Sequence, residues 1–262
     1  MSKPKTRWIV IFVILVALQL LALGYSSSPE TGSTEGLDKS DTAWLLVATA
    51  MVLFMTPGLS FFYGGMVSVK NVISTMLQSF IALGVISLLW YLVGFSLAFG
   101  DSIGGFIGNP ATFFAFHNVG TGVHPALSPT VPLMLFAFFQ LKFAIITPAL
   151  ITGSFAERVK FTSYLIFMCL FSLLIYAPLA HWTWHPDGFL RKLGVLDFAG
   201  GTVVHMSAGF AALAGAYILG KREHKFHMPA NIPFIILGTG IDRKSTRLNS
   251  SHIPLSRMPS SA

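Results

Sequence analysis

Residues 131–155 read VPLMLFAFFQLKFAIITPALITGSF, and Lys142 is the only charged side chain among them. About 20 apolar residues in a row are enough for a helix to span the hydrocarbon core of a bilayer. Backbone polar groups find no water at that depth, so such a segment must bond its own peptide groups and is helical. Residues 131–155 therefore predict a membrane-spanning helix.

Other apolar stretches repeat this pattern along the chain, at residues 44–62, 72–99, 162–180 and 200–219. A sixth run opens at Ile232 and stops at Ile241, which is too short to span. Pro57 and Pro148 fall inside two of the stretches, where we expect them to kink the helix. The predicted fold class is an all-α polytopic membrane protein.

The composition of the 262 residues excludes several classes of protein. They are 53% hydrophobic and 10% charged, whereas a soluble domain carries about 25% charged residues. Cys169 is the single cysteine, which excludes a disulfide-stabilised scaffold. The formal net charge of +7 lies in short loops and in residues 242–262 rather than in a basic stripe. We therefore expect a lipid bilayer, and no nucleic acid, as the partner.

The two ends of the chain differ from its middle. Residues 1–24 combine a basic start, a short apolar core and a small-residue end, which predicts a signal peptide; a retained anchor helix is the alternative. Residues 25–42 are polar and suit an exported N-terminus. Residues 242–262 read DRKSTRLNSSHIPLSRMPSSA, without helical periodicity. We expect a disordered tail there and interpret it as non-native sequence, because a membrane helix that halts halfway has no physical rationale.

Loop charges predict the orientation. With residues 25–42 outside, the inner turns hold six basic residues, namely Lys70, Arg158, Lys160, Lys221, Arg222 and Lys225. The outer loops hold three, namely Lys39, Arg191 and Lys192. The excess of basic residues on one side predicts a multi-pass protein of the cytoplasmic (inner) membrane with its mature N-terminus outside.

His205 is the first candidate for function. Ala208, Gly209, Ala212 and Ala216 follow it at helical spacing, and such small residues mark faces where membrane helices approach closely. We therefore expect His205 to point into the protein, where an ionisable side chain is a candidate for function. The alternative is a neutral imidazole bonded to a neighbouring carbonyl group.

Aromatic and acidic residues supply further candidates. Phe139 and Phe143 share a helix face, either as a site or as ordinary core or lipid contacts. Trp184 is either a cation-binding face or part of an interfacial aromatic belt. Asp197 suits a helix cap and could also organise an outer cation site. Lys142 must snorkel, reach an aqueous vestibule or stay neutral.

Metal and enzyme chemistry have little support in the sequence. His181 and His185 stand at i and i+4, but no suitable third ligand lies nearby, so no metal is expected. The phosphate-binding GxxxxGK[ST], HExxH and GxSxG motifs are all absent. We expect neither an enzyme nor a cofactor.

Three ordered motifs resemble the Amt/Mep-type ammonium transporters. They are TPGLSFFYGG at residues 56–65, FQLKFAIITPALITGSFAERVKF at 139–161 and LDFAGGTVVHMSAG at 196–209. The resemblance covers about residues 43–241. It implies a fold of eleven helices with two inverted five-helix halves, of which this chain carries the first, and a homotrimeric assembly.

The resemblance also assigns roles. It implies an outer recruitment site with Phe139 and Trp184, a pore gate with Phe143, a pore-lining His205 and structural support of the outer site by Asp197. It implies ammonium recruited as a cation, deprotonated and passed as ammonia through a hydrophobic pore, with a PII-type cytoplasmic regulator as a possible partner. An ammonium sensor of the same fold is the alternative, and a channel for another neutral gas a weaker one.

The same resemblance implies an incomplete chain. The family pore lies between two halves, so we expect His205 and Phe143 to face lipid or an open groove here, and this chain not to transport.

Overall fold

The computed structural model describes residues 13–14, 16–17, 20, 32–222 and 228–250. The predicted signal peptide over residues 1–24 therefore lies almost wholly outside the described residues. The same holds for residues 25–31 of the polar N-terminus and for residues 251–262 of the tail.

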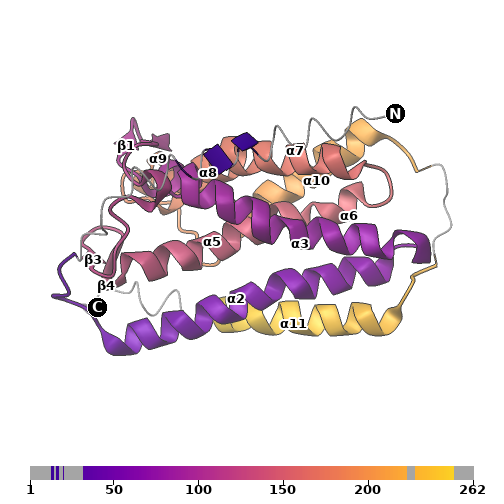
Figure 1. Cartoon of the computed structure of the whole chain (residues 1–262), viewed down its shortest axis with the longest axis horizontal. Helices are drawn as coiled ribbons and strands as arrows, with labels where there is room; N and C mark the ends of the chain where they lie inside the picture. The colour runs from indigo at the N-terminus through magenta and orange to yellow at the C-terminus, as the bar shows by residue number, and fades with distance from the viewer. Residues whose placement is uncertain (1–12, 15, 18–19, 21–31, 223–227, 251–262) are drawn as a thin grey trace.

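Five helical segments are long and apolar enough to cross a membrane, and they pack side by side as a bundle (Figure 1). They are Lys39–Met66, Val69–Phe99, Leu133–Phe155, Phe161–Lys192 and Gly201–Leu219. The predicted all-α polytopic membrane class is therefore confirmed, and each predicted apolar stretch corresponds to one segment.

Most of these segments contain a change of helical pitch. The first is the single helix α2 (Lys39–Met66), and the second joins α3 (Val72–Leu89), a π-helical turn (Trp90–Gly94) and α4 (Phe95–Phe99). The third joins α5 (Leu133–Leu150) and α6 (Thr152–Phe155). The fourth joins α7 (Phe161–Phe171), a π-helical turn (Ser172–Tyr176) and α8 (Ala177–Trp184), followed by α9 (Phe189–Lys192). The fifth joins a π-helical turn (Gly201–Met206) and α10 (Ser207–Leu219).

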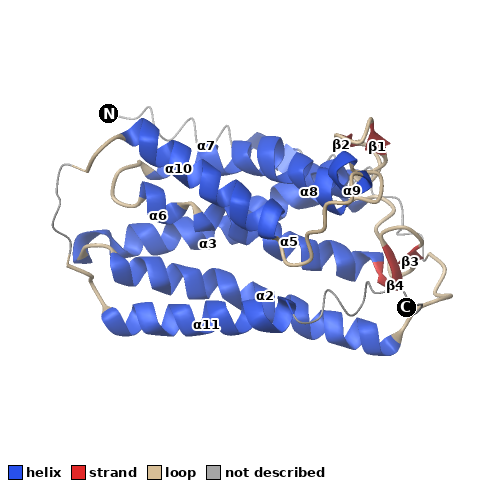
Figure 2. Cartoon of the chain, turned by 180° about the vertical axis from the view of Figure 1, so that it is seen from behind, coloured by secondary structure: helices blue, strands red, loops and turns tan. Residues whose placement is uncertain are grey.

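Short strands cover one end of the bundle, in the loop between α4 and α5 (Figure 2). β1 (Ser102–Ile103) pairs antiparallel with β2 (Ile107–Gly108), and β3 (Val123–His124) pairs antiparallel with β4 (Ser128–Pro132). The chain before α2 joins this layer, because the backbone N–H of Asp38 donates to the carbonyl oxygen of Thr130 over 2.8 Å. This end carries the loops that the sequence places outside.

The first membrane helix begins earlier than the apolar stretch that predicted it. The Asp38 carboxylate accepts hydrogen bonds from the backbone N–H groups of Ser40 (2.7 Å) and Asp41 (2.9 Å). A side-chain acceptor satisfies N–H groups that have no partner inside the helix. This cap lets α2 begin at Lys39 although hydrophobicity rises only at Trp44.

Pro148 marks a break in the third segment. α5 ends at Leu150, and the chain turns at Ile151 before α6. Two carbonyl oxygens at the break accept tyrosine hydroxyls, that of Pro148 from Tyr164 (3.1 Å) and that of Leu150 from Tyr63 (2.7 Å). These bonds satisfy carbonyl oxygens in the last turn of α5, where the regular helical pattern ends. Pro57, in contrast, lies within the continuous helix α2.

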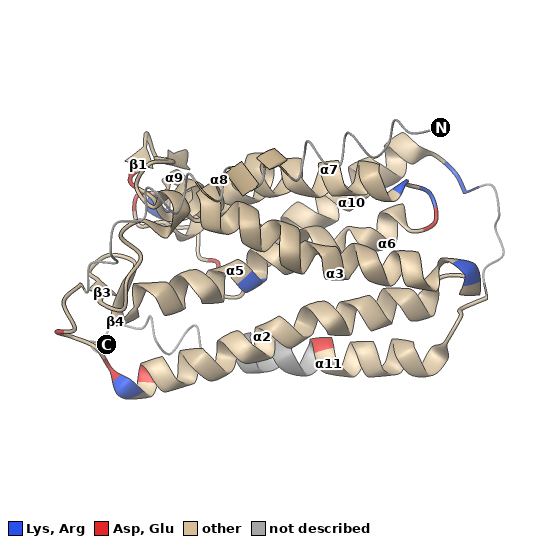
Figure 3. Ribbon diagram, viewed as in Figure 1, with Lys and Arg blue, Asp and Glu red and all other residues tan. Residues whose placement is uncertain are grey.

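Most charged side chains lie at the two ends of the bundle, apart from a basic residue within α5 and an acidic residue within α11 (Figure 3). At the end opposite the strands, one Glu157 carboxylate oxygen accepts from the Ser68 backbone N–H (2.9 Å) and the Asn71 side-chain amide (3.0 Å). The other lies 3.7 Å from the Arg222 guanidinium. Glu157 therefore ties together three turns that are far apart in sequence.

A further helix, α11 (Ile232–Ser250), lies alongside α2 in both views (Figures 1 and 2). The expectation of disorder from residue 242 is therefore wrong for residues 242–250, which continue this helix. Close approach of the two backbones explains the packing: a Cβ on Gly238 would meet the Gly58 carbonyl oxygen and the Phe62 nitrogen. Small residues permit such contacts between membrane helices.

Gly238→Leu should separate α11 from α2, because the added side chain has no room. We expect the free energy of unfolding to fall by about 1–3 kcal/mol, as is usual for overpacking. Gly240→Leu is the matched control, since a Cβ there meets no atom within 4 Å, and should change it by about 0.5 kcal/mol or less. Reversible unfolding in mixed micelles measures both; equal effects would show that α11 does not pack on α2.

Candidate functional site

Asp197 anchors the start of the fifth membrane segment. One carboxylate oxygen accepts from the backbone N–H of Gly201 (2.8 Å), and the other accepts from Thr202 (2.9 Å) and Val203 (3.0 Å). Asp197 is buried; its bond to Val203 is also buried, and its bonds to Gly201 and Thr202 are partly buried. A carboxylate at this place also complements the positive end of the helix dipole. The predicted helix cap is confirmed.

Trp184 is connected to the same residue. Its indole N–H donates a 2.9 Å hydrogen bond to the backbone carbonyl oxygen of Asp197. The side chain is buried rather than standing in an exposed belt. The last residue of α8 and the cap of the fifth segment therefore form one unit.

Three aromatic rings form a buried cluster beside this unit. Phe143 lies between the other two, with its ring centroid 5.0 Å from that of Phe139 and 6.4 Å from that of Trp184, both in edge-to-face arrangements. All three are less than a tenth exposed. Phe143 is buried among described residues, so the expectation that it faces lipid or a groove is wrong.

These predicted residues converge at the end of the bundle that carries the strands. Phe139 is in the second turn of α5, which directly follows β4, and Trp184 ends α8, which packs against β2. Phe139 and Trp184 contact each other through Phe143 rather than by a ring contact of their own. The structure thus brings together Phe139, Phe143, Trp184 and Asp197.

His205 does not join them, since its side chain is exposed. This exposure agrees with the expectation that His205 faces lipid or an open groove in this chain, and not with an inward direction. The small residues divide between two faces: Ala212 and Gly215 contact α6, through Ser154 and Phe155, whereas Gly209 has nothing within 4 Å of an added Cβ. The π-helical turn that contains His205 also alters the spacing from which its direction was predicted.

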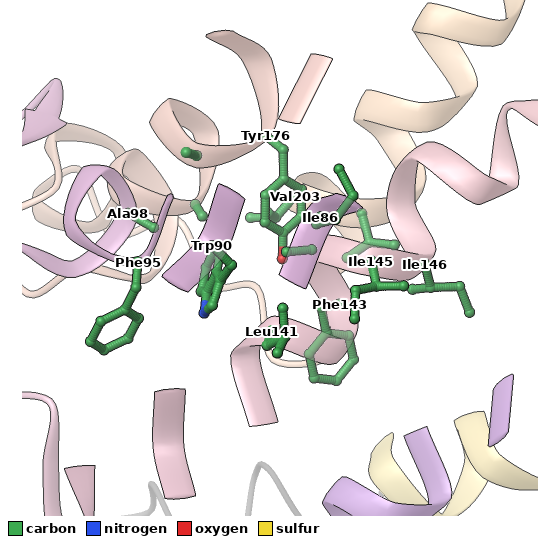
Figure 4. Packing of buried hydrophobic residues seen from close by; sticks show 14 of the residues in the cluster. Ile86, Trp90, Phe95, Ala98, Leu141, Phe143, Ile145, Ile146, Tyr176 and Val203 are labelled. Carbon is green, nitrogen blue, oxygen red and sulfur yellow. The ribbon is translucent and has the colours of Figure 1, made fainter. Parts of the chain in front are cut away.

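Sequence reasoning did not single out two residues that complete the buried side of the cluster. Tyr176 and Val203 are fully buried in the core that contains Phe143, and Figure 4 shows them converging with Ile86. The Tyr176 ring centroid lies 6.3 Å from that of Trp90. Trp90, Tyr176 and Val203 each belong to a π-helical turn, a feature that no local sequence pattern predicts.

Two other candidates lie away from the cluster. The Lys142 ammonium stands 6.0 Å from the ring centroid of Phe138, a residue that is 41% exposed. Lys142 therefore shares a face of α5 with Phe138, about 100° around the helix axis from Phe143. The rings of His181 and His185 stack with centroids 4.4 Å apart. Within the described residues, no three metal-ligating side chains are grouped.

Comparisons with known proteins point in one direction. The model of the Ammonium Transporter Family matches residues 43–241. The chain is 48% identical over 223 residues to an ammonium transporter of Aquifex aeolicus, which covers 84% of this chain and 52% of that one. A putative ammonium transporter of Methanothermobacter thermautotrophicus is 46% identical over 206 residues, covering 78% and 50% respectively.

Solved structures show the same likeness. Saccharomyces cerevisiae Mep2 matches with a TM-score of 0.76 and 33% identity over 84% of this chain and 50% of that chain. A structure titled Sensor Amt Protein matches with a TM-score of 0.73 and 31% identity over 84% and 56%. The chain spans about half the length of the curated relatives it matches.

Asp197→Ala should destabilise the protein by about 2–4 kcal/mol, because one buried and two partly buried N–H groups lose their carboxylate acceptor. Asp197→Asn keeps one acceptor oxygen and should cost about 1 kcal/mol. The matched control is Asp187→Ala, which removes an exposed ion pair with Lys192 (2.9 Å) and should cost at most about 1 kcal/mol. Reversible unfolding in mixed micelles ranks the three; equal losses for Asp197→Ala and Asp187→Ala would contradict the cap.

Proposed function

The chain belongs to the ammonium transporter family, and from this we propose that it serves ammonium/ammonia transport across the cytoplasmic membrane. The observation that carries the proposal is the buried cluster of Phe139, Phe143 and Trp184 held against the Asp197 cap. The spacing of these residues in the chain matches the family motifs, and their rings meet in space.

The cluster suits recruitment of a small cation. The face of an aromatic ring attracts a monovalent cation by about 0.5–2 kcal/mol, more when water is excluded. Phe139 and Trp184 supply two such faces, and the Asp197 carboxylate adds negative charge nearby. Its three backbone bonds hold that carboxylate in place.

A dry aromatic gate then separates ammonium from potassium. A bare cation is strongly disfavoured once it leaves water. Ammonium can give up a proton and continue as neutral ammonia, whereas potassium has no neutral form. In this proposal Phe143 closes the path, and His205 hydrogen-bonds ammonia or accepts a proton beyond it.

Assembly and regulation extend the same proposal. A homotrimer and a PII-type cytoplasmic regulator follow from the family resemblance, and the basic inner turns give such a regulator charged groups to contact. The sensor alternative has less support, since the curated relatives are named as transporters.

The proposed orientation predicts which ends react with reagents added outside the cell. In a Cys169→Ser background, Ala126→Cys lies in the strand-bearing loop and Lys221→Cys lies at the opposite end. A membrane-impermeant maleimide should label the first in intact cells and the second only after lysis. The reverse pattern would place the N-terminus inside.

Transport is best tested by joining residues 43–241 to the remaining half of the Aquifex aeolicus relative. This chimera should take up methylammonium. Trp184→Leu should raise its KM by about 2- to 30-fold, which corresponds to the loss of one cation–π contact, and His205→Ala should abolish uptake or admit potassium.

Trp182→Leu is the matched control, because that indole packs on Phe106 and Phe189 away from the cluster. Its KM should stay near the unmodified value. Equal effects at both tryptophans would remove Trp184 from the recruitment site, and unchanged uptake with unchanged potassium exclusion in His205→Ala would remove His205 from the path.

A further inference from the structure

His181 is a fully buried histidine whose two ring nitrogens both have partners on other elements. Nδ1 lies 3.0 Å from the carbonyl oxygen of Ala98, near the end of α4, and Nε2 lies 2.8 Å from the Ser102 hydroxyl in β1. A carbonyl oxygen only accepts, so Nδ1 carries a hydrogen. In the neutral ring Nε2 then accepts from Ser102, whose oxygen in turn accepts from the Gly105 N–H over 3.1 Å.

These bonds join α8 to segments about 80 residues earlier in the chain, since the partners are separated by 83 and 79 positions. The chain after α8 folds back tightly on the same place: a Cβ on Gly188 would meet the carbonyl oxygens of His181 and Trp182. The C-terminal turn of α8 is therefore fixed both to α4 and to the β1–β2 hairpin.

Trp184 stands three residues after His181, at the end of that fixed turn. Its ring is held from the other side by the bond to Asp197. The indole thus has two supports, one acting on its backbone through His181 and one acting directly on its N–H group. Together the two supports act on both the backbone and the ring of Trp184, whose centroid lies 6.4 Å from that of Phe143.

We propose that His181 is the positioning residue of the aromatic cluster: its bonds to Ala98 and Ser102 hold the end of α8 so that Trp184 faces Phe143. This proposal rests on the proposed transport function only for the role given to Trp184 in binding a cation. The positioning of Trp184 by His181 is tested without measuring transport. His181 itself touches neither the three rings of the cluster nor, in this assignment, the transported cation.

The test uses the 262-residue chain in lipid nanodiscs, labelled with 5-fluorotryptophan and observed by 19F NMR. The five tryptophans give five resonances, assigned by Trp→Phe replacements made one at a time. His181→Phe keeps a flat ring that can stack on His185 but removes both bonds, so the Trp184 resonance should shift or broaden. Ser102→Ala removes one bond and should cause a smaller change in the same direction.

Two further variants distinguish positioning from a general effect on the fold. His181→Asn keeps an amide donor toward the Ala98 carbonyl and should restore most of the Trp184 signal. His124→Gln is the matched control, because this histidine lies in the same loop layer and its Nδ1 accepts from the Leu127 N–H, not from α8. The resonance of buried Trp90 should stay unchanged throughout.

An unmoved Trp184 resonance in His181→Phe and Ser102→Ala overturns the proposal. The proposal is also overturned if all the resonances shift in His181→Phe and shift in the same way in His181→Asn. His181 would then only maintain the fold. If His181→Phe does not fold, the other two spectra test the proposal. It then requires a shifted Trp184 resonance in Ser102→Ala and a nearly unshifted one in His181→Asn.

Ammonium itself separates this inference from the proposed function. Titration of the unmodified chain with ammonium chloride against sodium chloride at constant ionic strength should move the Trp184 resonance, and His181→Phe should need several-fold more ammonium for the same shift. If the Trp184 resonance shifts in His181→Phe but does not shift with ammonium, recruitment at this site is contradicted. The positioning role of His181 is then still supported.

Discussion

A peptide group inside hydrocarbon has no water to bond, and every irregularity in this bundle must satisfy that constraint. The chain does so with side chains from distant segments. At the break after Pro148 the carbonyl oxygens accept the hydroxyls of Tyr63 and Tyr164. At the start of the fifth segment the N–H groups donate to Asp197. Each break thereby becomes a junction between membrane segments.

The candidate site arises from one of these junctions. The carboxylate that satisfies the fifth segment belongs to a residue whose carbonyl oxygen holds Trp184, and Trp184 contacts Phe143. A group needed for folding therefore also brings a negative charge beside an aromatic cluster. In the proposed function, stability and recruitment depend on the same residue, so the two can be separated only by variants that leave the cap intact, such as Trp184→Leu.

The residues of the proposed path differ in how far this chain encloses them. Phe139, Phe143 and Trp184 are enclosed by residues of this chain, whereas His205 lies on a face of the fifth segment that stays exposed in the described structure. A histidine that handles ammonia works best where water is excluded. Enclosure of His205 therefore requires another surface against α10.

The sequence by itself determined the membrane class, the five spanning segments and the capping role of Asp197. Hydrophobicity over about 20 residues and a side-chain acceptor before a helix are local properties, and both can be predicted without knowing the neighbours. The motifs also indicated the family and the aromatic residues of interest.

Tertiary structure alone decided the direction of His205, the burial of Phe143 and the supports of Trp184. The small-residue pattern predicted an inward His205, whereas the resemblance to half of a two-half fold predicted one that faces lipid or a groove. The structure decides for the second, because the side chain is exposed. The helix over residues 242–250 has no periodicity in sequence and is defined only by the structure. In the sequence His181 stood out only as one of a pair with His185, because Ala98 and Ser102 are about 80 residues away. Contacts over such separations exist only once the helices are packed.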